Sequence, residues 1–345
     1  MNIRTPFQNF YMNSIPKKKI LLIGGLVYDF DNKSLITNLL DRCTPIGLIS
    51  NGICVVKNKI YIITANSNAQ VNGILEYDVQ NDTLINLNST LFTQNYSSWS
   101  SFPAILNDEL FLVVKEMVFY GEATGQLRKF IFETNEWSEL LCPEIPITSL
   151  CYLNGVYWLG SSQGNARKCT TYPSTTSWEA LSTPNPNSLS VGYATPLYTS
   201  QGRLYLSCPA PSHTSKSAYL YELLGNEFQV VLSWANNGSD PVSFSCLSQE
   251  EDFSVFQGCF GSSFPYTENR LYVSLNTEDE LIQKNAPDNN YVCSCIRCED
   301  EILVLTATDS TNLNLYKTQD FNTYEPILSN ITSNALASKL QLLYL

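Results

Sequence analysis

The amino-acid sequence predicts an all-β protein: a seven-bladed β-propeller of four-stranded antiparallel blades, with the first blade closed by the C-terminal strand. Three observations lead to this prediction. One hairpin motif recurs seven times at an average spacing of about 48 residues, which is the length of one four-stranded blade. The segments between the hairpins are rich in β-branched and aromatic residues and have almost no helical periodicity. The first repeat lacks an inner strand, whereas the chain ends on a lone strand.

The recurring hairpin begins with a strand that ends in an aromatic or apolar residue. A short acidic turn rich in Asn and Thr follows, and a large apolar residue opens the next strand. The seven copies span residues 28–35, 77–84, 130–137, 172–178, 221–228, 275–281 and 316–324. Since they cover almost the whole chain, we expect one propeller domain over residues 17–345, preceded by an N-terminal extension, residues 1–16.

A second signature lies upstream of most hairpins, where a polar turn pair precedes a strand of β-branched and aromatic residues. Examples are Asn58-Lys59, Asp108-Glu109 and Asn154-Gly155. Before each pair comes a short apolar run, such as residues 53–56, which we predict to be the innermost strand of its blade. Each repeat therefore supplies four strands.

The two ends of the chain predict how the ring closes. The first repeat starts at its second strand, residues 19–25, and the chain ends on an unpaired strand, residues 339–345. Pairing of these two segments would satisfy the sheet edges that an open ring exposes. We therefore expect the C-terminal strand to complete the N-terminal blade.

Two segments resemble known propeller families. Residues 20–25, which end in Gly24-Gly25, together with Tyr28-Asp29 and Leu35, resemble a kelch repeat, although the glycine pair is absent from the other six units. The kelch resemblance implies a β-propeller. Kelch-like propellers include copper oxidases of the galactose oxidase type, whose metal site needs two histidines. This chain has a single histidine, His213. Residues 316–324 resemble a degenerate sialidase-type Asp-box in which Asn322 replaces the usual glycine and the spacing is one residue short, and these departures weaken an inference of glycoside hydrolysis.

Charge and composition exclude several kinds of partner. The chain has 20 basic and 32 acidic residues and a net charge of −12, which disfavours nucleic acid and anionic membrane surfaces. It has no apolar stretch of the roughly 20 residues needed to span a bilayer, and its start lacks the apolar core of a signal peptide. Most of the eleven cysteines lie in apolar strand-like runs, as buried free thiols do. We expect a soluble protein of the cytoplasm or another reducing compartment, or one incorporated in a virion.

The sequence contains no recognisable catalytic constellation. Nucleophile schemes that use histidine would depend on His213, which lies in a predicted loop, and no glycine-rich phosphate loop occurs. Cys293, Cys295 and Cys298 would need a fourth ligand to hold zinc. Packing of an inner strand is the favoured interpretation, with Cys293 and Cys295 on one face. We therefore expect no catalysis, no cofactor and no metal.

Binding is expected on the face that carries the long loops, because variable loops on a rigid scaffold usually carry recognition. The predicted loops are residues 65–73, 93–103, 161–168, 208–216 and 258–269. They contain the candidate partner-binding residues Tyr96, Trp99, Arg167, His213, Phe264 and Tyr266. The leading hypothesis is a non-catalytic protein-interaction scaffold or a subunit of a large assembly such as a virus or phage particle. A glycan-binding propeller and a glycan-acting enzyme are the alternatives.

Overall fold

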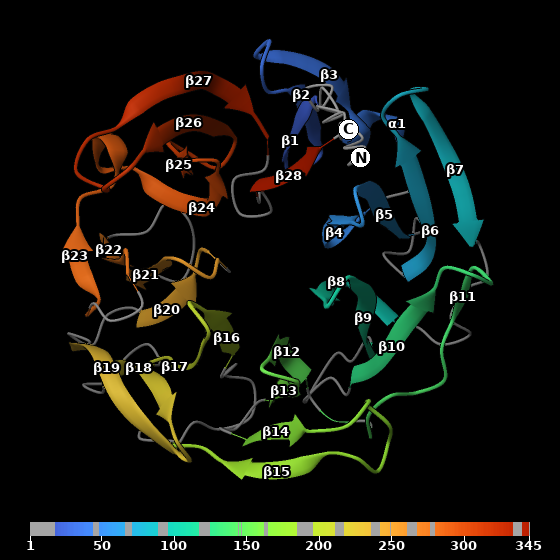
Figure 1. Cartoon of the computed structure of the whole chain (residues 1–345), viewed down its shortest axis with the longest axis vertical. Helices are drawn as coiled ribbons and strands as arrows, with labels where there is room; N and C mark the ends of the chain where they lie inside the picture. Colours follow the sequence, from blue (N-terminus) through green and yellow to red (C-terminus); the bar gives the residue numbers. More distant parts are fainter. Residues whose placement is uncertain are drawn as a thin grey trace, which may run out of the picture.

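A computed structural model describes most of the chain. The described residues are 18–43, 48–65, 71–88, 96–116, 125–143, 145, 147–161, 165–184, 196–210, 217–235, 242–248, 250–260, 268–276, 280–333 and 340–344. They form seven four-stranded antiparallel sheets arranged in a ring, as Figure 1 shows. The predicted seven-bladed β-propeller is therefore confirmed. In the described part of the chain, no helix is long and apolar enough to cross a membrane.

The blades are numbered in chain order, and the strands of each are given from the centre outward. Blade 1 contains β28 (Leu340–Tyr344), β1 (Lys19–Ile23), β2 (Leu26–Asp29) and β3 (Ser34–Asn38). Blade 2 contains β4 (Leu48–Val56), β5 (Lys59–Ala65), β6 (Val71–Asp78) and β7 (Thr83–Asn88). Blade 3 contains β8 (Tyr96–Leu106), β9 (Glu109–Glu116), β10 (Gly125–Ile131) and β11 (Glu136–Trp137). Blade 4 contains β12 (Ile147–Leu153), β13 (Val156–Ser161), β14 (Asn165–Cys169) and β15 (Glu179–Ser182).

The last three blades follow the same plan. Blade 5 contains β16 (Leu197–Ser200), β17 (Arg203–Cys208), β18 (Ser217–Leu224) and β19 (Glu227–Ala235). Blade 6 contains β20 (Val242–Cys246), β21 (Ser254–Phe260), β22 (Glu268–Ser274) and β23 (Ile282–Lys284). Blade 7 contains β24 (Tyr291–Cys298), β25 (Glu301–Ala307), β26 (Asn312–Thr318) and β27 (Glu325–Thr332). The described residues add two short helices between blades, α1 (Leu39–Arg42) and the 3-10 turn η1 (Pro287–Asn289).

The turns follow the sequence signatures closely. All seven predicted hairpins connect the third strand of a blade to its fourth. The polar pairs connect first and second strands, but in blades 2, 3 and 7 the turn lies one residue earlier than predicted, at Lys57-Asn58, Asn107-Asp108 and Glu299-Asp300. In blades 2 and 3 both turn residues have positive φ, as a two-residue hairpin turn requires, because that backbone twist matches the flanking strands.

Each junction between consecutive blades has its own apolar core. The seven clusters of buried residues each combine side chains from two neighbouring blades. At the junction of blades 2 and 3, for example, Tyr61 and Ile63 pack with Leu112 and Phe130. Burial of apolar surface stabilises a fold by roughly 25 cal/mol per Å². In this protein that stabilisation is therefore distributed around the whole ring.

The C-terminal strand closes the ring as predicted. It pairs antiparallel with β1, from Lys19 opposite Tyr344 to Ile23 opposite Leu340. The Gln341 side chain extends to blade 2, where Nε2 donates to the Ile53 carbonyl at 2.8 Å and Oε1 accepts from the Val55 amide at 2.8 Å. On the other side, the Leu340 amide donates to the Ser294 hydroxyl of blade 7. A single strand thus joins three blades.

The outermost strands of all seven blades are either short or irregular. Three of them, β11, β15 and β23, are at most four residues long. The pairings of β3, β7, β19 and β27 with their inner neighbours contain register shifts, and β27 also contains Pro326. Bulges, proline and short length are the usual devices that prevent a sheet edge from pairing with another chain.

Candidate functional site

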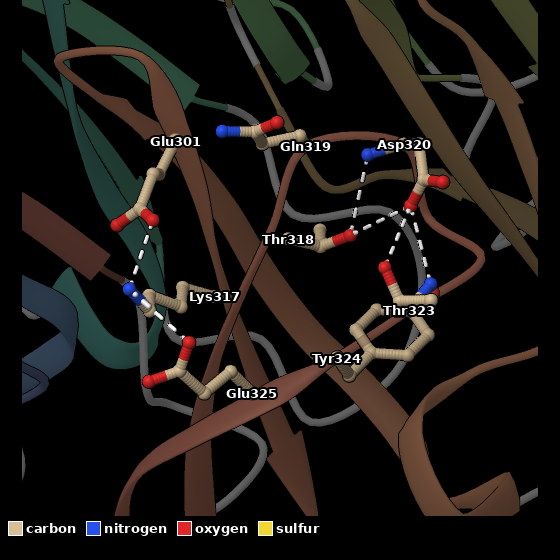
Figure 2. Close-up of a pocket in the computed structure, with 8 residues that line it drawn as sticks. All are labelled: Glu301, Lys317, Thr318, Gln319, Asp320, Thr323, Tyr324 and Glu325. Atoms are coloured by element: carbon tan, nitrogen blue, oxygen red, sulfur yellow. Dashed lines mark hydrogen bonds and ion pairs between the residues drawn. The ribbon is translucent and has the colours of Figure 1, made fainter.

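A polar pocket of about 420 Å³ lies at the hairpin between β26 and β27 of blade 7. Its lining residues are Glu301, Lys317, Thr318, Gln319, Asp320, Thr323, Tyr324 and Glu325, shown in Figure 2. Seven of the eight belong to or border the hairpin that resembles an Asp-box, and Glu301 comes from the start of β25. We refer to this group as the blade 7 pocket.

Asp320 shapes the pocket by holding the turn. Its Oδ1 accepts from the backbone amides of Asn322 at 2.9 Å and Thr323 at 3.1 Å, and its Oδ2 accepts from Asn322 Nδ2 at 3.1 Å. These bonds lower the pKa of Asp320 to about 2. Because the carboxylate is ionised and engaged in the turn, it serves structure rather than acid–base chemistry.

Phe321 explains why the turn needs these bonds. It has a positive φ of 56°, which is unfavourable for a bulky side chain, and its side chain is buried in the core between blades 6 and 7. Its amide donates to Thr318 Oγ1 at 3.0 Å. The hydrogen bonds of Thr318 and Asp320, together with the burial of the Phe321 ring, stabilise this conformation.

Lys317 lies between two carboxylates on one side of the pocket. Its Nζ is 2.9 Å from Glu301 Oε1 and 3.3 Å from Glu325 Oε2, so it links β25, β26 and β27 (Figure 2). The hydrogen bonds to Glu301 and Glu325 raise the pKa of Lys317, which therefore stays charged at neutral pH. With three carboxylates and one ammonium group, the pocket is negative overall.

Tyr324 provides an aromatic wall. Its hydroxyl donates to the Asn285 carbonyl at 2.8 Å, and its ring packs edge-on against Tyr316 and Phe321, each with centroids 6.4 Å away. Burial is the main cause of the raised pKa of Tyr324. Gln319 is exposed at the mouth of the pocket, on the side of Glu301 in Figure 2. The wall is therefore fixed, while the Gln319 carboxamide has no hydrogen bond to any residue that the structure describes.

The structure corrects the placement of three predicted binding residues. Tyr96 and Trp99 were expected in a loop but belong to β8, an eleven-residue strand whose pairing with β9 is irregular between Ser97 and Phe102. Arg167 was also expected in a loop but lies in β14, opposite Leu159 and Ala180. Polar residues interrupt both strands, which makes their pattern loop-like in the sequence.

The other three predicted residues, His213, Phe264 and Tyr266, lie outside the described residues. Arg167 is in blade 4, whereas the pocket is in blade 7, so the described structure does not place it among the pocket residues. Glu301, Lys317 and Glu325 are not among the binding residues predicted from the sequence. The available signal was the strand pairing, because Lys317 is directly opposite Glu325.

The cysteines of β24 pack in the core, but not with the predicted facing. Cys295 lies in the core between blades 6 and 7, whereas Cys293 and Cys298 pack between blades 7 and 1. The reason is a register shift between Val292 and Ser294, which places Cys293 in a bulge and reverses the alternation of side chains. Among the described residues, no group of three or more His, Cys, Asp or Glu side chains is arranged to hold a metal ion.

Comparisons with known proteins support the fold alone. The chain matches no protein-family model, so the kelch resemblance has no family match behind it, and no curated protein matches it in sequence. Similar solved structures include a candidate 6-phosphogluconolactonase from Bacteroides fragilis (TM-score 0.55, 9% identity, covering 96% of this chain and 99% of that one). Another, from Bacteroides uniformis, has a TM-score of 0.53 and 10% identity over 95% and 99% of the two chains.

A third similar structure is the β-propeller domain of the Trilobed protease from Pyrococcus furiosus. Its TM-score is 0.49 at 11% identity, covering 82% of this chain and 85% of that one. The two Bacteroides structures, with TM-scores above 0.5 at 9% and 10% identity, establish a common fold alone, and function must be argued from the site.

Proposed function

We propose that the protein is a non-catalytic, protein-binding scaffold whose partner docks on the outer rim of blades 5 and 6, formed by β19, β23 and the end of β18. The observation that carries the proposal is a group of exposed aliphatic side chains on these two consecutive blades. Leu224, Val230, Val231 and Ile282 are 46%, 52%, 36% and 57% exposed, respectively. We call these four residues the rim aliphatics.

The strand that carries two of them suits a protein interface. With nine residues, β19 is the longest outer strand among the described residues, and Glu227 is its only charged residue. The centres of protein interfaces are depleted of charge, and their burial of apolar side chains provides much of the binding energy. Because the β18–β19 pairing is irregular around Val231, the partner is expected to contact side chains rather than add a strand.

The blade 7 pocket supports binding rather than turnover. General acid catalysis needs a carboxyl group that is protonated near the working pH. Asp320 instead has a pKa of about 2 and is held in its turn, and Glu301 and Glu325 are both paired with Lys317. The net charge of −12 further favours a basic protein surface as the partner, because opposite charges steer association.

Affinity capture from native source material, with quantitative mass spectrometry, tests the proposal. The baits are the wild-type chain, the double variant Val230→Lys/Val231→Lys, and the control Ile85→Lys. Ile85 is a suitable control because it is likewise exposed on an outer strand, β7 of blade 2. We expect a stoichiometric protein partner with the wild type and the control, and at least tenfold less with the double variant.

Two results would overturn the proposal. Equal capture by all three baits would remove the rim aliphatics from the interface. Absence of any stoichiometric protein partner with folded wild-type bait would remove the scaffold function itself. Circular dichroism of each bait establishes that it is folded before capture.

A further inference from the structure

We propose that the blade 7 pocket binds a saccharide, neutral or carrying an amino group. This inference goes beyond the proposed scaffold function, because the pocket lies on the β26–β27 hairpin and the rim aliphatics lie on blades 5 and 6. Either proposal can fail without the other.

The polar groups of the pocket match sugar hydroxyls. Glu301 and Glu325 each use one carboxylate oxygen to bind Lys317, and the second oxygen of each has no hydrogen bond within the described residues. The Gln319 carboxamide likewise has none, so it offers one acceptor and two donors. Two neighbouring hydroxyl groups of a sugar can each donate one hydrogen bond and accept another. The two carboxylates beside Lys317 provide acceptors for them, and the Gln319 carboxamide provides both an acceptor and donors.

The Tyr324 ring supplies the apolar part of such a site. A sugar ring has a face of C–H groups that packs on an aromatic side chain. Tyr324 lines the pocket, and its position is fixed by the bond to the Asn285 carbonyl and by the rings of Tyr316 and Phe321. The ring is thus already ordered before any ligand arrives, which reduces the entropy lost on binding.

Charge and size narrow the ligand class. The excess of carboxylates over Lys317 repels phosphorylated, sulfated and uronic acid ligands. The polar lining disfavours purely apolar ligands, whereas a volume of about 420 Å³ is within the range of small-molecule sites. A neutral or amino sugar satisfies all these conditions. Because the site is open to solvent, we expect a dissociation constant on the order of 1 mM for a monosaccharide.

The test begins with the folded full-length chain on a glycan array that includes neutral, amino and acidic saccharides. The best ligand is then titrated in solution by NMR against the wild type and three variants. Gln319→Ala and Glu325→Gln should each weaken binding roughly fivefold or more, because the first removes the carboxamide and the second replaces a charged acceptor oxygen with an amide donor. Gln80→Ala is the matched control, since Gln80 is an exposed glutamine in the corresponding hairpin of blade 2, and it should leave affinity unchanged.

Tyr324 requires a pair of variants. Tyr324→Phe keeps the ring and should retain binding, whereas Tyr324→Ala should abolish it, with thermal unfolding measured for both. The proposal is overturned if no saccharide binds, if only acidic saccharides bind, or if Gln319→Ala and Glu325→Gln bind as well as the wild type. A titration with spermidine completes the test: binding of this polyamine without binding of any sugar would make the pocket a cation site instead.

Discussion

Aspartate side chains stabilise several turns of the propeller in the same way, by accepting hydrogen bonds from the residues that follow. Asp29 accepts from the amide and side chain of Asn32, and Asp78 does the same with Asn81. Asp320 repeats the arrangement in blade 7. The acidic, Asn-rich turns of the sequence are thus a structural device, and their number reflects the number of blades rather than a number of binding sites.

This device makes the stability of the protein depend on pH. The folded-state pKa of Asp320 is about 2, below its ordinary value of 3.8, because the turn donates hydrogen bonds to the charged form. A carboxylate with a lowered folded-state pKa stabilises the fold above its unfolded pKa and loses this effect as the pH falls through the folded pKa. We therefore expect Asp320→Asn to lower the midpoint of thermal unfolding at pH 7, and the difference from wild type to shrink between pH 4 and pH 2.

The measurement is a series of thermal melts over that pH range. Asp31→Asn is the control, because the Asp31 carboxylate accepts no hydrogen bond within the described residues. A constant difference between wild type and Asp320→Asn at all pH values would contradict the assignment of the lowered pKa to the turn.

At the scale of elements, α1, which leaves the outer strand of blade 1, joins that blade to blade 2. The Leu39 amide donates to the Gly25 carbonyl at 2.8 Å, and Arg42 forms an ion pair with Asp82 in the hairpin of blade 2. A Cβ atom added at Gly25 would lie 2.4 Å from Leu40 Cγ, which is too close. Gly25 is therefore needed for the close approach of α1.

Substitution at Gly25 tests this contact. Gly25→Ala should destabilise the protein by about 1 to 2 kcal/mol, because the added methyl group overlaps Leu40. In a Leu40→Ala background the overlap is gone, and the same change should be neutral or stabilise by about 0.5 kcal/mol, since alanine restricts the unfolded chain. Urea unfolding of the four proteins of this double-mutant cycle gives the coupling free energy, and additivity within about 0.5 kcal/mol would refute the contact.

Elements were predictable from the sequence where the information is local. Strand periodicity and turn residues identified the third-to-fourth-strand hairpin of every blade, because turn chemistry and strand propensity act over a few neighbouring residues. The connection between β20 and β21 illustrates what was not predictable. Residues 247–253 connect these two strands in place of a tight turn. The Leu247 carbonyl accepts a hydrogen bond from the Cys295 amide, and Glu250 Oε1 accepts one from the Arg297 amide, so the connection is bound to blade 7.

The opposite side of the same connection contacts blade 5. Gln201 occupies a turn with a positive φ of 52°, yet its side chain is buried, donating to the carbonyls of Asp252 and Ser274 and accepting from the Ser254 hydroxyl. A glutamine in a turn is ordinarily exposed. Its burial depends on the loop of a neighbouring blade, so no local pattern indicates it. The blade 7 pocket was missed for the same reason, because its lining depends on the register of three strands.

At the scale of the whole molecule, the ring closes through a single strand. This closure was predictable because the first repeat has only three strands and one further strand stands at the end of the chain. The sequence did not indicate how β28 is held between its neighbours. Gln341 pairs with both the Ile53 carbonyl and the Val55 amide of β4, which is the innermost strand of blade 2. Because each of the seven apolar cores lies between two blades, loosening one core removes packing contacts from both of the blades that form it.

Gln341→Ala should therefore destabilise the closed ring by about 2 kcal/mol, since it leaves one donor and one acceptor of an inner strand without partners. Gln341→Glu should cost a similar amount at pH 7, because a carboxylate can accept from the Val55 amide but cannot donate to the Ile53 carbonyl. Urea unfolding measures both, with Gln283→Ala on the exposed outer strand β23 as the control, expected within about 0.5 kcal/mol of wild type. If Gln341→Ala unfolds like the control, the β28–β4 contact does not help to close the ring, and closure depends on the pairing of β28 with β1 and its contacts with blade 7.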